Sequence, residues 1–517
     1  MPRRGQLCQE GLCKTRRVVR NLADYVRGSA ASRPEAPALV VGATRLTWAQ
    51  VDAAVDAAAS AFAAEGLQPG DRVGLLLGNR PEFVLAYFGA LRAGMVAVPL
   101  NPGFTAPEIS RLMRHAGVRL VVSDRDTTQA VHAADLSNVI HVVVGPGRPD
   151  ERRFDDLLAA GRAAGPPSPP SPEPDLAVIL YTSGTTGEPK GAMLTHAALV
   201  ASIEQVASLP MSIIEPEDVV LGVLPLAHVY SLNGTLGAVA RSGAALVLVD
   251  RFDPDATLRL VREHGVTNIP GAPPLWVAWA GRPDLREALA GVRMLFSGAA
   301  SLPASVLEQI TSATGLPLFE GYGLTEAAPG VSSTLVSGHP KAGSVGKAFP
   351  GVEIRLVDED GGEVDVGDPG EIWVRGPNLF SGYWPDGDGG PDADGWYATG
   401  DVAYTDDDGD LHLVDRRKEL VIVSGFNVYP REIEEVLQEH PDVVEAAVVG
   451  VPHPQTGEAV KAYVVARPGS GVDAESVLAH CADRLARFKR PTIVQVVGEL
   501  PHSVTGKVAK RRLKDAG

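Results

Sequence analysis

The sequence predicts an α/β protein, in which a large multi-subdomain N-terminal domain with mixed sheets sandwiched by helices precedes a small α+β C-terminal domain. Helix-like and strand-like segments alternate from about residue 21, which is typical of largely parallel sheets covered by helices. Strand-like segments that are nearly continuous apolar runs indicate strands buried on both faces. A new α/β pattern follows the charged run DRRKE at 415–419. We therefore expect domains at 19–416 and 417–517, after an N-terminal extension, 1–18, that is expected to be mobile.

The spacing of apolar residues predicts the first elements in order. Residues 47–66 have helical spacing with Thr47 at the start and Gly66 at the end, so they predict a capped helix. Three further segments predict a strand, a helix and a strand: DRVGLLLG at 71–78, PEFVLAYFGALRAG at 81–94 and VAVPL at 96–100. We find no short internal repeat, which argues against a solenoid.

Two breaks in composition divide the rest of the chain. AGPPSPPSPEP at 164–174 is expected to be a stiff surface connector, and the apolar run LAVIL at 176–180 predicts a buried strand directly after it. GEIWVRGPNLFSGYW at 370–384 is typical of β-structure and precedes an acidic, glycine-rich stretch at 385–396. The C-terminal α/β pattern comprises PREIEEVLQEH, VVEAAVVGV, KAYVVARPG and AESVLAHCADRLARF.

Composition excludes several classes of protein. A chain of 517 residues, 45 % hydrophobic, is long enough for a large core and fits a globular protein. The net charge of -16 opposes general nucleic-acid binding, which depends on basic surface. The three cysteines have neither the number for a disulfide framework nor the spacing for a zinc site, which fits a reducing cytoplasm. We expect neither a secretory signal nor a membrane-spanning helix.

The segment YTSGTTGEPKGAMLTH, residues 181–196, directly follows a predicted strand. Ligands bind at the carboxyl ends of strands in open α/β sheets, and glycines there let backbone N–H groups approach a phosphate. The hydroxyl side chains add donors, and Lys190 adds a compact positive charge. The spacing differs from the P-loop, in which lysine directly follows the second glycine. Taken alone, these residues also fit a flexible polar turn.

This segment does not stand alone, because YTSGTTGEPKG resembles the phosphate loop of the adenylate-forming superfamily of acyl-CoA synthetases, firefly-type luciferases and peptide-synthetase adenylation domains. The further motifs of that superfamily follow in order: EGYGLTEAAP at 320–329, YATGD at 397–401, VDRRKELVIVSGFNVYPREIEEVL at 414–437 and LPHSVTGKVAKRRL at 500–513. Within the superfamily the chain most resembles bacterial medium- and long-chain fatty-acid–CoA ligases, on segments such as GSVGKAFPGVEIRLVDEDG and VGVPHPQTGEAVKAYVV.

The resemblance implies an AMP-forming acid–thiol ligase with Mg²⁺ as cofactor and with ATP and CoA as co-substrates. A carboxylate and ATP would give acyl-AMP and pyrophosphate, after which the thiol of CoA would give acyl-CoA and AMP. The resemblance also implies which residues bind ATP or AMP: Thr182, Ser183, Gly184, Thr185, Thr186, Gly187, Lys190, Gly298, Ala299, Ala300, Glu320, Gly321, Tyr322, Gly323, Thr325, Asp401, Arg416 and Lys507.

Matched motif positions imply individual roles. Tyr322 resembles the ring that packs on adenine, Thr325 the hydroxyl that contacts the α-phosphate, and Glu326 the carboxylate that holds Mg²⁺. Asp401 and Arg416 resemble the pair that binds ribose. In isolation, Glu326 also fits a helix-start acid stabilised by the helix dipole, and Asp401 a turn residue.

Lys507 has the strongest implied catalytic role. The family's lysine at this position offsets the negative charge that repels the attacking carboxylate from the α-phosphate. A solvated basic tail is the alternative, and we expect that state for its neighbours Lys510, Arg511, Arg512 and Lys514.

The resemblance also implies a mobile C-terminal domain that exchanges two segments at the active site. Lys418 matches the hinge position. After the rotation, Ser424, Gly425 and Phe426 would replace Lys507, and the glycine would let the pantetheine arm of CoA pass close to the backbone.

The acyl pocket is implied less clearly. Small residues around it favour a long, narrow apolar channel, and Ile422 stands where several aryl–CoA ligases carry lysine. His228 is expected to act in catalysis by gating the carboxylate end, and a hydrogen-bonded structural histidine is the alternative. The implied lining includes Ala227, His228, Ala272, Pro273, Ser297 and Gly323.

We therefore expect a fatty acid, ATP and CoA as partners and no nucleic acid. We expect a cytoplasmic location, with peripheral contact at the inner face of the membrane left open, and either a monomer or a homodimer. The functional alternatives are a CoA ligase for an aryl or other specialised carboxylic acid, an acyl-AMP ligase that passes the acyl group to a carrier protein, a noncatalytic binding protein of the same fold, and a luciferase-like oxygenase.

Overall fold

The computed structural model describes residues 19–146, 148, 151–166, 175–182, 190–416, 419, 421–423, 426–453, 457–482, 484–485, 487–502 and 508–515. The backbones of Arg416 and Phe426 are described, but their side chains are not. The N-terminal extension and most of the proline-rich connector lie outside these residues, as do several predicted site residues: Ser183, Gly184, Thr185, Thr186, Gly187, Lys418, Ser424, Gly425 and Lys507.

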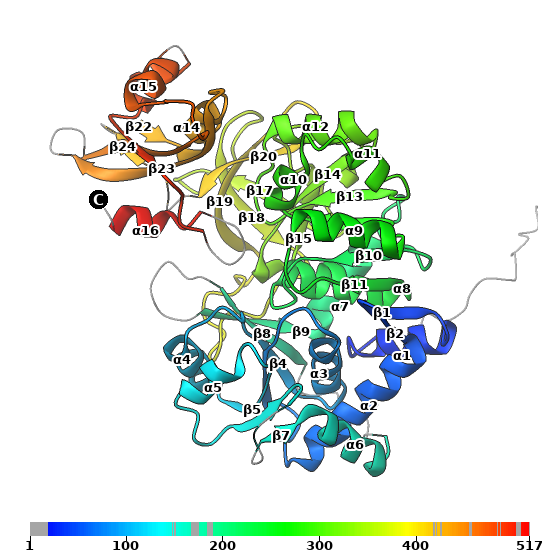
Figure 1. Cartoon of the computed structure of the whole chain (residues 1–517). Coiled ribbons are helices and arrows are strands. Elements are labelled where there is room, and N and C mark those ends of the chain that lie inside the picture. The colour runs from blue at the N-terminus through cyan, green and yellow to red at the C-terminus, as the bar shows by residue number, and fades with distance from the viewer. Residues whose placement is uncertain are drawn as a thin grey trace, which may run out of the picture.

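A seven-stranded sheet forms one half of the N-terminal domain (Figure 1). All neighbouring strands are parallel except the last pair, β8 and β9. Adjacent strand residues alternate between two apolar layers, since Leu75 packs with α2, α3 and α6 and Leu76 with α4 and α5. The strand order is β7 (Arg152–Arg153), β6 (Ile140–Val143), β5 (Val118–Ser123), β3 (Arg72–Leu76), β4 (Val96–Pro99), β8 (Leu176–Thr182) and β9 (Lys190–Thr195).

A nine-stranded mixed sheet forms the other half. Its central strands are parallel, and antiparallel strands lie at both edges. The order is β16 (Lys347–Ala348), β15 (Gly330–Ser333), β14 (Leu318–Gly323), β13 (Met294–Ser297), β12 (Asn268–Gly271), β10 (Val219–Gly222), β11 (Ala245–Leu248), β1 (Pro37–Val41) and β2 (Thr44–Thr47).

Two smaller sheets follow in the sequence. The first is antiparallel, with the order β17 (Glu353–Val357), β18 (Gly370–Arg375), β19 (Tyr397–Thr405) and β20 (Leu411–Arg416). The second belongs to the small C-terminal domain at the top of Figure 1, which has an apolar core of its own. It has the order β22 (Phe426–Val428), β21 (Val421–Val423), β24 (Gly457–Ala466) and β23 (Val443–His453), with β25 (Ile493–Val497) also paired to β24.

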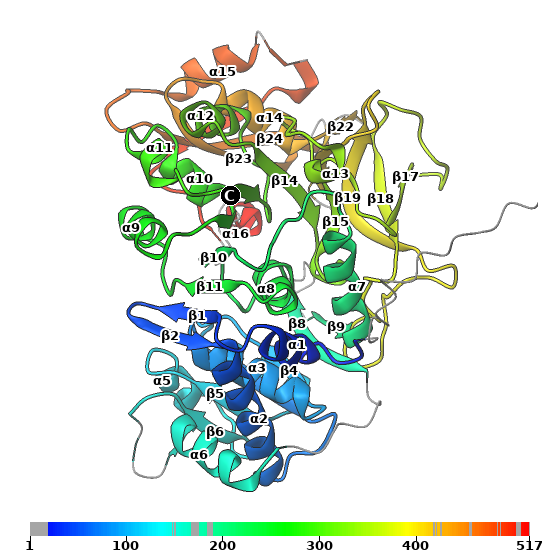
Figure 2. The same cartoon turned by 90° about the vertical axis from the view of Figure 1, so that its right-hand side faces the viewer.

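Helices cover these sheets, as Figure 2 shows from a second direction. The helices of the N-terminal domain are α1 (Asp24–Ser32), α2 (Trp48–Ala64), α3 (Pro81–Arg92), α4 (Ala106–Ala116), α5 (Thr128–Ala133), α6 (Phe154–Ala164), α7 (His196–Ala207), η1 (Tyr230–Gly237), α8 (Ala238–Ser242), α9 (Pro254–His264), α10 (Pro273–Trp279), α11 (Leu285–Ala288), α12 (Ala304–Thr314), η2 (Thr325–Ala327) and α13 (Thr334–Ser337). The C-terminal domain adds α14 (Pro430–Gln438), α15 (Ala474–Ala482), η3 (Arg487–Lys489) and α16 (Lys510–Asp515).

The structure confirms the predicted fold class and most predicted elements. Helix α2 begins with a capping box between Thr47 and Gln50, and the chain leaves it through Gly66 at φ +87°. The β-rich prediction for 370–384 is correct for β18 and wrong for residues 376–384, which belong to no strand. No helix among the described residues has the length and apolar character needed to cross a membrane.

Candidate active site

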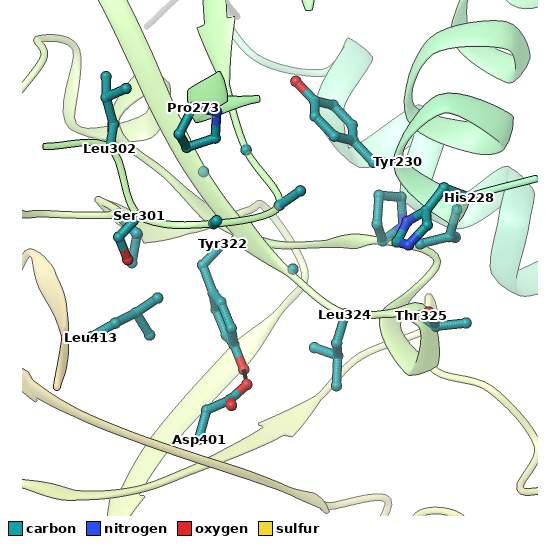
Figure 3. A pocket seen from close by; sticks show the side chains of 18 of the residues that line it. His228, Tyr230, Pro273, Ser301, Leu302, Tyr322, Leu324, Thr325, Asp401 and Leu413 are labelled. Atoms are coloured by element: carbon teal, nitrogen blue, oxygen red, sulfur yellow. Dashed lines mark hydrogen bonds between the residues drawn. The ribbon is translucent and has the colours of Figure 1, made fainter. Parts of the chain in front are cut away.

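A cavity of about 2820 Å³ lies between the carboxyl ends of central strands, the antiparallel sheet and the C-terminal domain. Figure 3 shows part of its wall. The structure therefore brings together predicted site residues from distant parts of the sequence. Those that line the cavity are Thr182, Lys190, Ala227, His228, Pro273, Gly298, Ala299, Ala300, Gly321, Tyr322, Gly323, Thr325, Glu326 and Asp401.

Three other described residues of the predicted site lie behind this wall. Ala272 precedes α10, Ser297 ends β13, and Glu320 lies within β14. Each is buried, with exposed fractions of 8 %, 1 % and 5 %. In this conformation they shape the wall, and contact of these residues with a ligand stays a prediction.

The predicted phosphate loop is flanked by two paired strands. Strand β8 ends at Thr182 and β9 begins at Lys190, and these two residues face each other in the antiparallel register. The ammonium of Lys190 lies 5.0 Å from the centre of the Tyr383 ring, a cation–π contact. The prediction that the motif follows the carboxyl end of a buried strand is confirmed for its described ends.

Close backbone packing explains the small residues at the ends of β13 and β14. A Cβ on Gly323 would lie 2.2 Å from the carbonyl oxygen of Pro329, so any side chain there would displace the wall. A Cβ on Gly298 would lie 3.1 Å from the Tyr230 ring. Ala299, between these strands, has φ +73°, a strained left-handed conformation for a residue other than glycine.

Tyr322 and Asp401 meet at the floor of the cavity (Figure 3). The hydroxyl of Tyr322 donates to Oδ2 of Asp401 at 2.6 Å. Asp401 on β19 and Arg416 on β20 are paired in the antiparallel register, so the backbone places the two residues predicted to bind ribose opposite each other. The side chain of Arg416 lies outside the described part of the chain.

Glu326 is held by a tyrosine that sequence reasoning missed. Its side chain is 8 % exposed, and the hydroxyl of Tyr383 donates to Oε1 at 2.6 Å. Burial and the charge of Glu326 raise the pKa of Tyr383, which keeps the hydroxyl protonated as a donor. The segment around Tyr383 is fixed by backbone bonds from Trp384 to Gly191 and from Phe380 to Glu326.

His228 lies beside an unusual helix. Its carbonyl oxygen accepts from the N–H of Leu232, and the π-helix η1 begins two residues after His228. Short π-helical segments often occur at functional sites. Asn233 holds this turn by donating to the carbonyls of Leu199 and Ala328 at 3.0 and 2.7 Å. His228 therefore lies in the cavity wall, and its gating role stays a prediction.

Tyr230, the first residue of η1, also lines the cavity. Its ring meets Phe296 edge to face, and its buried hydroxyl has no hydrogen-bond partner among the described residues. Sequence reasoning missed both Tyr230 and Tyr383. Tyr230 lies two residues after His228, which was predicted, whereas no spacing rule links Tyr383 to Glu326.

Glu320 is a buried carboxyl whose environment favours the protonated form. Burial raises its pKa from 4.5 to about 7, against the opposing effects of an N–H donated by Leu302 and the charge of Arg431. The unfolded chain thus loses this proton at lower pH than the folded chain. This residue therefore makes folding less favourable as pH rises from 4.5 through 7.

We expect Glu320→Gln to remove this pH dependence. The free energy of unfolding of the variant minus that of the parent protein should therefore increase from pH 5 to pH 8, by up to about 3 kcal/mol. Urea unfolding at both pH values measures the difference, and Glu308→Gln on the exposed face of α12 is the matched control. An equal pH response in the parent protein and Glu320→Gln would contradict the assignment.

The prediction of a solvated basic tail is wrong for Lys510. Its side chain is 15 % exposed, and its ammonium pairs with Glu419 and Glu434 at 3.0 and 2.9 Å. These contacts tie α16 to α14, because Glu434 lies on α14. Arg512 and Lys514 are exposed, as predicted.

Comparisons with known proteins agree with this geometry. The family model for the AMP-binding enzyme matches residues 26–384, and that for the AMP-binding enzyme C-terminal domain matches residues 432–507. The chain is 33 % identical to a long-chain-fatty-acid–CoA ligase of Bacillus subtilis (strain 168), over 96 % of this chain and 94 % of that protein. It is 36 % identical to a feruloyl-CoA synthase of an Amycolatopsis species, over 93 % and 96 % of the two chains.

A solved structure shares the whole architecture. The crystal structure of ATP-bound MatB from Rhodopseudomonas palustris superposes with a TM-score of 0.88 at 33 % identity, covering 96 % of this chain and 98 % of that one. The first family model covers more than half of the chain, and these relatives match nearly all of it. The chain therefore belongs to the AMP-binding enzyme family, the adenylate-forming superfamily that its motifs resemble.

Proposed function

We propose that this enzyme is an ATP-dependent acid:CoA ligase that acts on medium- to long-chain fatty acids. In the first step a carboxylate oxygen attacks the α-phosphorus of ATP, giving acyl-AMP and releasing pyrophosphate. In the second step the thiol sulfur of CoA attacks the acyl carbon, giving acyl-CoA and releasing AMP. Relatives named as fatty-acid–CoA ligases support a CoA ligase that acts on fatty acids. Relatives named as feruloyl-CoA synthases are similarly close, so the choice of acid depends on the residues of the pocket.

The observation that carries the proposal is one cavity with two kinds of wall. Thr182, Lys190 and Glu326 line the side expected to take the phosphates. Apolar residues of α10 form another side of the cavity, and one of them, Val277, is 50 % exposed. Contact between an exposed apolar side chain and an alkyl chain lowers the free energy, because it removes apolar surface of both groups from water.

The residues of the site take the following roles in this scheme. Lys190 attracts phosphate oxygens, Tyr322 packs on adenine, and Asp401 holds the ribose together with Arg416, whose side chain lies outside the described residues. His228 and Pro273 adjoin the acyl group, and Thr325 contacts the α-phosphate. Together with Lys507, which lies outside the described residues, these groups would bring carboxylate and phosphorus into contact and offset their charges.

Glu326 fits a bound Mg²⁺. Mg²⁺ commonly takes one or two carboxylates and completes its shell with water and phosphate oxygens, and Tyr383 occupies only Oε1 of this carboxylate. When bound, Mg²⁺ would neutralise charge on the phosphates.

We also propose a domain boundary at 416/417, with Lys418 as the hinge. Ser424, Gly425 and Phe426 would then lie along the path of CoA. The cytoplasmic location is likewise a prediction from the sequence.

Tyr230 favours a second candidate, a CoA ligase for a hydroxylated aryl acid. Its hydroxyl is buried at the cavity wall without a described partner, and a substrate hydroxyl could satisfy it. A site that hydrogen-bonds a substrate hydroxyl discriminates strongly against the analogue that lacks it. The two candidates therefore predict opposite substrate orders.

Product mass spectrometry decides between them. The protein is mixed with ATP, Mg²⁺, CoA and one acid at a time, from acetate through octanoate and palmitate to benzoate, cinnamate and coumarate. We expect acyl-CoA and AMP, with the highest kcat/KM among the fatty acids. Coumarate far above both cinnamate and palmitate would overturn the fatty-acid proposal in favour of the aryl ligase. Acyl-AMP without acyl-CoA would instead indicate a carrier-protein acceptor.

A further inference from the structure

A group of metal-ligating side chains lies at the far edge of the seven-stranded sheet. It comprises His132 on α5, His141 on β6 and Glu151 directly before β7. None of the three lines the large cavity. In Figure 1, α5 and β7 lie in the lower part of the molecule, and the C-terminal domain lies at the top. The proposed ligase chemistry has no use for this group.

The three side chains are close enough to share one ion. A ligand atom from each lies within 4.8 Å of the others. Nε2 of His132 lies 2.5 Å from Oε1 of Glu151, which makes an ion pair when the imidazole is protonated, and this oxygen accepts no hydrogen bond from the described residues. The Glu151 side chain is 8 % exposed. A mostly buried carboxylate oxygen thus faces a ring nitrogen without a hydrogen bond between them.

Neighbouring groups hold two of these ligands, His141 and Glu151, in place. Nε2 of His141 is hydrogen-bonded to Oγ of Ser123 at 2.7 Å, and this hydroxyl also contacts Oγ1 of Thr128 at 2.8 Å. Oε2 of Glu151 accepts the N–H of Arg148 at 2.6 Å. Metal-binding histidines and carboxylates generally have such outer partners, which orient them toward the ion. Nδ1 of His141 and Oε1 of Glu151 are the atoms that these bonds leave to a ligand.

Solvent has a path to the site. A pocket of about 380 Å³ adjoins it, lined by both histidines together with Asp135 and Ser137. The side chain of His132 is 25 % exposed. A hydrated cation could therefore reach the ligands and keep water in its remaining coordination positions.

We propose that His132, His141 and Glu151 bind one divalent transition-metal ion, with Zn²⁺ as the best match. Two imidazole nitrogens and one carboxylate oxygen are ligands that Zn²⁺ takes with a water in the fourth position. Mg²⁺ prefers oxygen ligands, so the ion of the ligase reaction would not compete well here. A second carboxylate cluster, Asp406, Asp408 and Asp410, carries no such site because the Lys341 ammonium already lies among its oxygens.

The ion would join three segments that meet at the sheet edge. Helix α5, strand β6 and the residue before β7 each supply one ligand. An ion that binds the folded chain and not the unfolded chain stabilises the fold by mass action. The role is structural, so occupancy should raise thermal stability without a requirement for Zn²⁺ in acyl-CoA formation.

The test uses the full-length protein without a histidine tag, stripped with a chelator. Zn²⁺ binding is measured by competition with a chromophoric chelator, and thermal unfolding is measured with and without Zn²⁺. The variants are His132→Gln, His141→Gln and Glu151→Gln, and the control is His339→Gln, an exposed histidine that contacts the carbonyl of Ser337. We expect one Zn²⁺ site in the parent protein and in the control. Each ligand variant should weaken that site at least about tenfold and remove the thermal shift.

Unchanged Zn²⁺ affinity in the three ligand variants would overturn the proposal, as would the absence of Zn²⁺ binding by the parent protein. Glu151→Gln keeps the size and one oxygen of the side chain, so it remains informative if His141→Gln unfolds through loss of the Ser123 contact. Substitution of Co²⁺ gives an independent readout. The visible absorption bands of bound Co²⁺ should have the positions typical of nitrogen and oxygen ligands in the parent protein. These bands should disappear in Glu151→Gln.

Discussion

Lys507→Ala is expected to slow acyl-AMP formation by about 100- to 1000-fold, the usual loss when a group that stabilises transition-state charge is removed. The carboxylate and the α-phosphate are both negative, and the family's lysine at this position offsets their repulsion as the new bond forms. Attack by the CoA thiol on the acyl carbon needs no such group between two anions. Acyl-CoA formation from supplied acyl-AMP should therefore be largely preserved.

Two assays separate these half-reactions. Pyrophosphate exchange into ATP measures adenylation, and release of AMP from supplied acyl-AMP and CoA measures thioester formation. Lys347→Ala is the matched control, since Lys347 is an exposed lysine that does not line the cavity, so the variant should leave both rates unchanged. An equal loss in both half-reactions would contradict the assigned role of Lys507 and favour a general structural role.

Local sequence signals predicted much of the fold because they depend on neighbouring residues. The capping box at Thr47, the chain exit at Gly66 and the apolar run of β8 each depend on residues a few positions apart. The same holds for the end of β8, where a motif follows a strand directly. The family resemblance then supplied the residues that should meet across the cavity, and the described ones largely do.

Contacts across the fold were not predictable in this way. Tyr383 and Glu326 are 57 positions apart, and their hydrogen bond depends on how the segment after β18 runs along β9. His132 and Glu151 come together because α5 and the start of β7 meet at one sheet edge. Lys510 gave the opposite error: a run of basic residues indicated a solvated tail, and tertiary packing places its ammonium between two glutamates.

Glu326→Gln is expected to lower kcat/KM for acyl-AMP formation by about 100-fold or more, because it removes the carboxylate charge proposed to hold Mg²⁺. The amide keeps the size of the side chain, so the fold should persist. The concentration of Mg²⁺ needed for half-maximal adenylation should rise as well. A normal rate with a normal Mg²⁺ requirement would contradict the role of Glu326.

Tyr383→Phe separates the position of this carboxylate from its charge. The variant removes the 2.6 Å bond to Oε1 and leaves the charge of Glu326, so we expect about a tenfold loss of adenylation, typical of a lost outer partner of a metal ligand. Added to Glu326→Gln, the same change should cost much less, because the carboxylate that it positions is already gone. Tyr404→Phe, whose ring stacks on His412 outside the cavity, is the control. Full additivity of the two losses would show that Tyr383 acts independently of Glu326.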